Sequence, residues 1–158
     1  MKKLLLTVLV LVLAFSTIGA TLASVNALKV GETTSFWSGR AGVTFVDSRF
    51  TGTVTVTRKS TDKVTGANAP EFTQRLLDVR LVDRNGNKVK FVIGPVYVYF
   101  KVTDKEMKAY DTQGLRIWYF DSWKNEWTKC ETVQVGNGKN GNELACRIRV
   151  FGLYGLGQ

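Results

Sequence analysis

Hydrophobic and polar residues alternate along most of the chain from residue 43 onward. Val54 and Val56, for example, alternate with threonines. Similar alternating sets follow over residues 77–81, 96–102, 115–119 and 144–150. A period of two is typical of β-strands with one buried face, and clusters of Gly, Asn, Asp and Ser separate the sets. The pattern therefore predicts an all-β protein, an antiparallel β-sandwich of about seven or eight strands.

One helical pattern interrupts these strands. Thr103 is a suitable capping residue, and Glu106 lies three positions later, as in a capping box. The pattern ends near Asp111 and Gly114. We therefore expect one short helix, of one or two turns, that connects two strands.

The sequence predicts a hairpin near Gly86. Which residues pair across it follows from the requirement that each face of the two strands be either apolar or polar. A two-residue turn would set Leu81 opposite Lys90 and mix apolar with charged residues on one face. A three-residue turn sets Leu81 opposite Val89 instead. That register also pairs Val79 with Phe91 and Leu77 with Ile93. Because a half-buried sheet needs consistent faces, we predict the three-residue turn, with Gly86 in the left-handed region.

The N-terminal segment has the layout of a secretory signal peptide. Lys2 and Lys3 precede an apolar run over residues 4–15, and small residues follow the run. We therefore expect a signal-peptide helix over residues 1–27, a single β-sandwich domain over residues 28–158, and a secreted or cell-surface location.

The sequence leaves the fate of this segment open. Cleavage after Ala27 has Val25 at the −3 position, and cleavage after Ala23 fits the small-residue rule nearly as well. A retained membrane anchor is the third outcome, because residues 4–23 are uncharged over about the length that spans a bilayer. Only in that case would the protein contact a membrane through this segment.

The two cysteines, Cys130 and Cys146, favour a disulfide, because export places this even pair in an oxidising compartment. Setting Cys130 opposite Cys146 on adjacent antiparallel strands gives a consistent inward face. The same register pairs Thr128 with Ile148, Thr132 with Leu144, and Trp127 with Arg149 on the outer face. A cation–π contact is then expected between Trp127 and Arg149.

Basic residues outnumber acidic ones by 22 to 13, and the formal net charge is +9. Six of the basic residues fall on the outward parity of their strands: Arg80, Lys88, Lys90, Lys101, Arg147 and Arg149. They predict a basic face that attracts anionic polymers of the cell envelope, such as wall polysaccharide or lipid headgroups. The alternative is a solvated surface that maintains solubility. Specific nucleic-acid binding is not expected, because no RNA- or DNA-binding signature is present.

Aromatic residues gather in a second predicted hairpin whose tip lies at residues 122–125. Alternation turns about half of them outward, and Trp118, Trp123 and Trp127 are candidates for stacking on sugar rings. The alternative is that these rings pack the core and the end of the sandwich. The hairpin is therefore a candidate glycan-binding platform.

Catalytic groups are scarce in the sequence. Histidine is absent, which removes histidine-based triads and histidine-ligated zinc. The sequence has neither a Gly-x-Ser-x-Gly elbow nor a glycine-rich phosphate loop before a helix. We therefore expect no enzyme activity, no catalytic residues, no metal site and no cofactor.

The C-terminal half resembles a known module. The strand over 98–103, the short helix over 104–110, the run over 115–121, Trp127 and the closing segment over 150–156 carry the resemblance. Together they are similar to the zona-occludens/netrin-receptor type β-sandwich of bacterial surface proteins. Some members of that family cleave themselves at a His-Phe-Ser triplet, which aligns here with Val150, Phe151 and Gly152. The resemblance therefore implies a scaffold or interaction module that lacks the autoproteolytic base and nucleophile.

These patterns converge on a secreted or cell-surface, non-catalytic structural or interaction module that contacts anionic envelope polymers. The alternative is a carbohydrate-binding module that uses the aromatic hairpin from Trp118 to Trp127.

Overall fold

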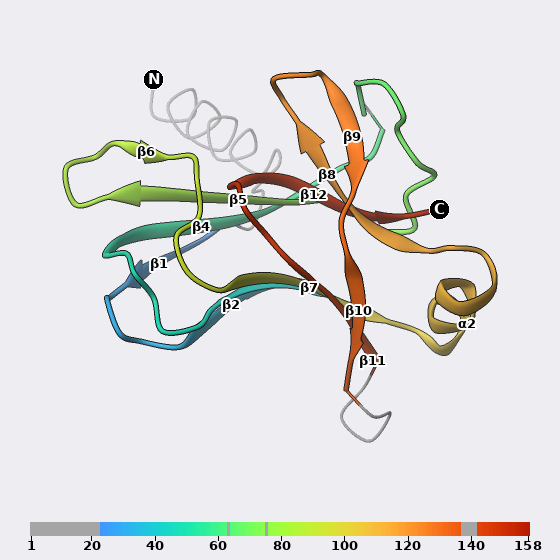
Figure 1. Ribbon diagram of the computed structural model, residues 1–158, viewed down its shortest axis with the longest axis horizontal. Helices are drawn as coiled ribbons and strands as arrows, with labels where there is room; N and C mark the ends of the chain where they lie inside the picture. The colour runs from blue at the N-terminus through green and yellow to red at the C-terminus, as the bar shows by residue number, and fades with distance from the viewer. Residues whose placement is uncertain (1–22, 63, 75, 137–141) are drawn as a thin grey trace, which may run out of the picture.

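The computed structural model describes residues 23–62, 64–74, 76–136 and 142–158 (Figure 1). Residues 1–22 of the predicted signal-peptide helix lie outside these ranges, and its described end, residues 23–27, forms most of strand β1 and is not helical. The described elements, in chain order, are β1 (Ala23–Leu28), β2 (Thr34–Ser38), β3 (Ala41–Phe45), β4 (Gly52–Lys59), β5 (Leu76–Asp83), β6 (Lys88–Val89), β7 (Val96–Val102), α2 (Asp104–Thr112), β8 (Arg116–Asp121), β9 (Glu126–Lys129), β10 (Thr132–Val135), β11 (Asn142–Arg147) and β12 (Gly152–Gly157).

The all-β class and the single short helix are confirmed in the described residues. The expected strand number of seven or eight is too low, because the structure has strands β1 to β12. Strands as short as β6 and β10 have too few residues for an alternating pattern to be recognised.

The strands form two antiparallel sheets in a sandwich-like arrangement (Figure 1). The seven-stranded sheet has the order β1-β4-β5-β12-β8-β9, with β6 beside β5. The five-stranded sheet has the order β10-β11-β7-β3-β2. Sequence neighbours are therefore often not sheet neighbours, as where β12 inserts between β5 and β8.

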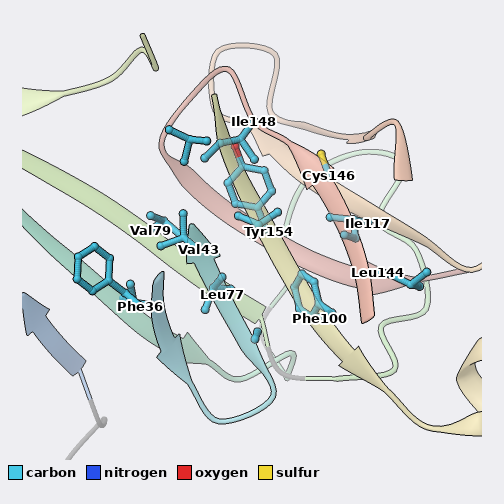
Figure 2. Packing of buried hydrophobic residues seen from close by; sticks show 14 of the residues in the cluster. Phe36, Val43, Leu77, Val79, Phe100, Ile117, Leu144, Cys146, Ile148 and Tyr154 are labelled. Atoms are coloured by element: carbon cyan, nitrogen blue, oxygen red, sulfur yellow. The ribbon is translucent and has the colours of Figure 1, made fainter. Parts of the chain in front are cut away.

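The core lies between the inward faces of the two sheets (Figure 2). Phe100 and Leu144 come from the five-stranded sheet, and Leu77, Ile117 and Tyr154 come from the seven-stranded sheet; all five are buried. The alternation in the sequence arises because every second residue of these strands enters this layer.

The hairpin between β5 and β6 has the predicted register near its turn. Leu81 pairs with Val89, and Gly86 has φ of +83°. The predicted continuation is wrong, because β6 ends at Val89. Val79 pairs with Gly152 and Leu77 with Tyr154, since β12 occupies the rest of this edge of β5.

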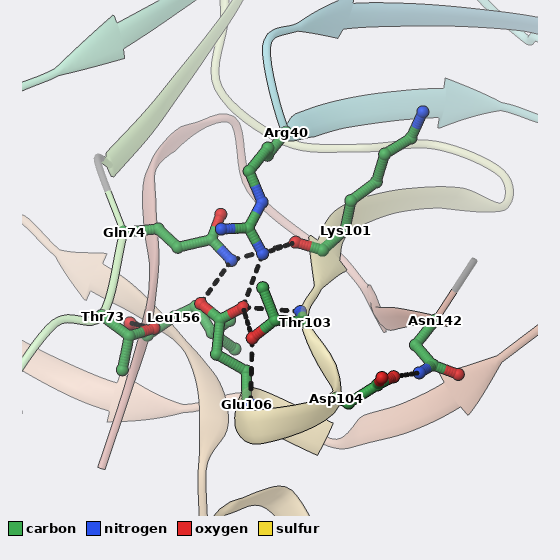
Figure 3. Close-up of polar contacts among 9 residues, drawn as sticks. All are labelled: Arg40, Thr73, Gln74, Lys101, Thr103, Asp104, Glu106, Asn142 and Leu156. Atoms are coloured by element: carbon green, nitrogen blue, oxygen red, sulfur yellow. Dashed lines mark hydrogen bonds and ion pairs between the residues drawn. The ribbon is translucent and has the colours of Figure 1, made fainter. Parts of the chain in front are cut away.

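The helix α2 begins as predicted, with Thr103 and Glu106 forming a capping box. Glu106 also accepts hydrogen bonds from Arg40 and Gln74, which join the helix to the β2–β3 turn and to the segment before β5 (Figure 3). Desolvation opposes ionisation, but the hydrogen bonds from Thr103, Arg40 and Gln74 outweigh it and lower the pKa of Glu106. The ionised carboxylate therefore fixes α2 to the sandwich.

The predicted disulfide between Cys130 and Cys146 is confirmed, with 6.1 Å between the two Cα atoms. The strand register predicted with it is wrong by two residues, because Thr132, not Cys130, pairs with Cys146. Cys130 follows β9 of the seven-stranded sheet, whereas Cys146 belongs to β11 of the five-stranded sheet. The disulfide therefore joins the sheets where the chain passes from one to the other.

The predicted contact of Trp127 with Arg149 is also absent. Trp127 pairs with Phe120 in the β8–β9 hairpin of the seven-stranded sheet, whereas Arg149 follows β11 of the other sheet. Alternation cannot reveal this change of sheet, because both sheets have the same period of two.

We expect reduction of the disulfide to lower the free energy of unfolding by about 3 kcal/mol, because it releases a loop of about 15 residues in the unfolded chain. The large core should keep the reduced protein folded at room temperature. Thermal unfolding with and without reductant measures the change, and a Cys130→Ala/Cys146→Ala variant should match the reduced protein. Two alkylatable thiols in the native, non-reduced protein would contradict the pairing.

Candidate functional site

A groove of about 1250 Å³ lies beside the β8–β9 hairpin. Its other walls are residues 90–94 and the connection from β11 to β12, residues 147–151. Backbone hydrogen bonds hold these two walls together, from Val92 N to Arg149 O (2.9 Å) and from Phe151 N to Lys90 O (2.8 Å). Segments far apart in the sequence thus build one site.

The groove is rich in exposed positive charge. Five basic residues line it: Lys90, Lys124, Lys129, Arg147 and Arg149. Asp121 and Glu131 are the acidic residues of the lining. Lys124 pairs with Glu126 at 3.6 Å, whereas the other four basic side chains make no ion pair with any residue that the structure describes. Uncompensated charges that converge on a concave surface attract anions.

Three of the six predicted basic residues, Lys90, Arg147 and Arg149, meet at this groove. The alternation of inward and outward residues along the strands predicted that they point outward. The pairing of residues 90–92 with residues 149–151 brings them together.

The other three predicted basic residues lie elsewhere, so the six do not form one face. Arg80 donates to Asp78 at 2.7 Å on the outer face of the seven-stranded sheet, and this hydrogen bond raises the pKa of Arg80. Lys88 belongs to β6. Lys101 lies on β7 with its ammonium 4.7 Å from the ring centroid of Trp37.

Lys124 and Lys129 also line the groove but were not among the predicted basic residues, and the ammonium of Lys129 lies 5.1 Å from the ring centroid of Trp118. Both lie in the β8–β9 hairpin, which the sequence pattern marked only for its aromatic residues. The sequence feature that could have identified them is their position, with one lysine at the tip and one at the far end of a predicted hairpin.

The three predicted tryptophans do not share one surface. Trp127 is only 2% exposed. It packs against Phe72, with 4.7 Å between the ring centroids, and its indole N–H donates to the carbonyl of Thr65 at 3.0 Å. The segment between β4 and β5 thus covers Trp127 on the outer face of the seven-stranded sheet.

Trp118 is half-buried on that same outer face, where its indole N–H donates to Gly157 O at 3.1 Å. Trp123 differs, since it lies in the turn of the β8–β9 hairpin with 78% of its surface exposed. The ammonium of Lys90 lies 5.8 Å from the ring centroid of Trp123. Of the three predicted tryptophans, Trp123 is the one that lines the groove.

A separate aromatic row lies on the outer face of the five-stranded sheet. Trp37, Tyr99 and Tyr97 follow one another with ring centroids 6.2 and 6.3 Å apart. The Trp37 ring lies over Gly42, where a Cβ atom would come within 2.7 Å of it. Alternation of Tyr97 and Tyr99 with buried valines was the sequence signal for this row, which the sequence prediction did not include.

Among the described residues, no group of three or more His, Cys, Asp or Glu side chains is placed to hold a metal ion. The helical structure within these residues includes no apolar stretch long enough to cross a bilayer. The groove itself offers basic groups, hydrogen-bonding groups and the exposed rings of Phe91 and Trp123.

No family model matches this chain, and the searches found no similar curated protein or solved structure.

Proposed function

We propose that this protein is an exported, non-catalytic interaction module that binds anionic polymers of the cell envelope through the basic groove. The observation that supports this proposal most directly is that five basic residues line one groove of about 1250 Å³ and that three of them, Lys90, Arg147 and Arg149, come from its two adjoining walls. The resemblance of the C-terminal half to surface-protein β-sandwiches, and the signal-like N-terminus, point in the same direction.

The groove suits a polymer better than a single small anion. Its basic groups come from three separate segments and extend along its walls, so successive anionic groups of one chain have separate partners. Arg147 and Arg149 can each hold a carboxylate or phosphate in a two-pronged hydrogen bond. The exposed ring of Trp123 adds an apolar face beside Lys90, against which a sugar ring can pack.

The proposal predicts binding that weakens steeply with salt. We expect the protein to bind alginate, a carboxylated polysaccharide, and to lose at least about tenfold in affinity between 50 and 300 mM NaCl as counterions return. Intrinsic tryptophan fluorescence or calorimetry measures the dissociation constant. Uncharged dextran is the matched control and should not bind. Salt-independent binding, or equal binding of both polymers, would argue against the groove charges.

A second candidate function is carbohydrate binding through the aromatic row of Trp37, Tyr97 and Tyr99. The observation that favours it is the position of three half-buried rings on an outer sheet face, beside the hydrogen-bonded hydroxyls of Ser35 and Thr44. In this case, neutral glycans should bind at high salt, and Tyr97→Ala should abolish that binding whereas Trp123→Ala should not.

A further inference from the structure

Strand β1 contains five residues that the longer of the two expected leader peptides would remove. It pairs with β4 along six residues, from Ala23 opposite Thr57 to Leu28 opposite Gly52. Leu28 is 1% exposed and belongs to the core between the sheets. Residues 23–27 therefore have defined positions in the folded domain.

β1 also protects an edge of the seven-stranded sheet. β4 pairs with β5 on one side and with β1 on the other, so β1 is the outermost strand there. Val25 and Ala27 are exposed, whereas Asn26 is half-buried and Leu28 is buried. Removing this strand would break its backbone pairing with β4 and make β4 the edge strand, which destabilises the sheet.

The two cleavage positions that fit the sequence have opposite consequences for β1. Cleavage after Ala27 would remove five of its six residues and leave Leu28 at the chain end. Cleavage after Ala23 would keep residues 24–28 paired with β4. The Ala27–Leu28 bond also lies within the paired stretch, whereas the Ala23–Ser24 bond lies at its end.

We infer that signal peptidase hydrolyses the Ala23–Ser24 bond and that the mature protein begins at Ser24. Ala23 then occupies the −1 position and Thr21 the −3 position, both with small side chains. One water molecule is consumed, giving a carboxylate on Ala23 and an ammonium group on Ser24. This inference rests on the proposed export, but not on the ligand of the groove.

The direct test is the mass and N-terminal sequence of the protein exported from a bacterial host that expresses the full chain. We expect a single mature form that begins at Ser24. A mature form beginning at Leu28 would overturn this inference and leave export intact. An exported chain that retains Met1 would overturn the cleavage and would indicate a retained anchor.

Two matched variants separate the two bonds. Ala23→Gln places a large polar residue at the −1 position of the proposed bond, and Ala27→Gln does the same at the other bond. Ala27 is exposed, so its replacement should leave β1 intact. In pulse-labelled cells we expect Ala23→Gln to slow removal of the leader at least about tenfold, and Ala27→Gln to be processed at the wild-type rate. The opposite result would assign cleavage to the Ala27–Leu28 bond.

Discussion

Replacing Tyr154 with Ala is expected to lower the free energy of unfolding by about 3–5 kcal/mol, the usual cost of removing a buried aromatic ring. Tyr154 is 1% exposed at the centre of β12, and its ring centroid lies 6.4 Å from that of Tyr119. Its hydroxyl donates a hydrogen bond to the carbonyl of Val150. Because domains of this size are stable by only about 5–15 kcal/mol, the variant should lose a large share of its stability. Urea denaturation measures the change.

Tyr154→Phe is the control, since it keeps the ring and removes only the hydrogen bond, at a cost of about 1 kcal/mol. Tyr154→Phe should also differ from the wild-type protein in alkali. Burial, and to a lesser degree the nearby Tyr119, raise the pKa of Tyr154 above its usual value. Above about pH 10 the unfolded chain loses this proton while the folded protein keeps it, so stability falls as the pH rises. Tyr154→Phe should show a smaller fall, and an unchanged alkaline slope would contradict the buried, protonated phenol.

Reversing two charges of the groove, with Lys90→Glu and Arg149→Glu together, is expected to weaken alginate binding by about 100-fold at 150 mM salt. Both side chains are exposed and line the groove from its two adjoining walls. Each charged hydrogen bond lost costs about 1.5–3 kcal/mol, and the new carboxylates add repulsion. The melting temperature should change little, because exposed substitutions of this kind seldom alter stability.

The matched control for this variant is Lys105→Glu with Lys108→Glu on α2. Both residues are exposed, and the pair changes the net charge by the same amount away from the groove. We expect its affinity for alginate to remain within about threefold of the wild-type value at 150 mM salt, where distant charges are screened. Equal losses in the two double variants would mean that net charge alone attracts the polymer.

Local features of the fold were predictable from the sequence because neighbouring residues determine them. The helix at Thr103 follows from a capping box, and the turn at Gly86 follows from consistent faces of two adjacent strands. The Cys130–Cys146 pairing needed only export and an even count. Its strand register was wrong because the passage of the chain between sheets after Cys130 depends on packing between distant segments.

The candidate site was predictable only in part for the same reason. Parity identified Lys90, Arg147 and Arg149 as outward residues, but not which of six basic residues would meet. Their proximity depends on a bridge between Phe91 and Val150, which no local pattern encodes. Likewise, Trp127 was expected on an outer face, where it does lie, but the covering segment with Thr65 buries it.

The most direct test of the proposed function is to map alginate binding on the isotope-labelled protein by NMR. We expect amide shifts on addition of alginate oligosaccharides to concentrate at residues 90–94, the β8–β9 hairpin and residues 147–151, and to disappear when salt is raised. Shifts centred on Trp37, Tyr97 and Tyr99, or no shifts at low salt, would contradict binding of anionic polymers at the basic groove.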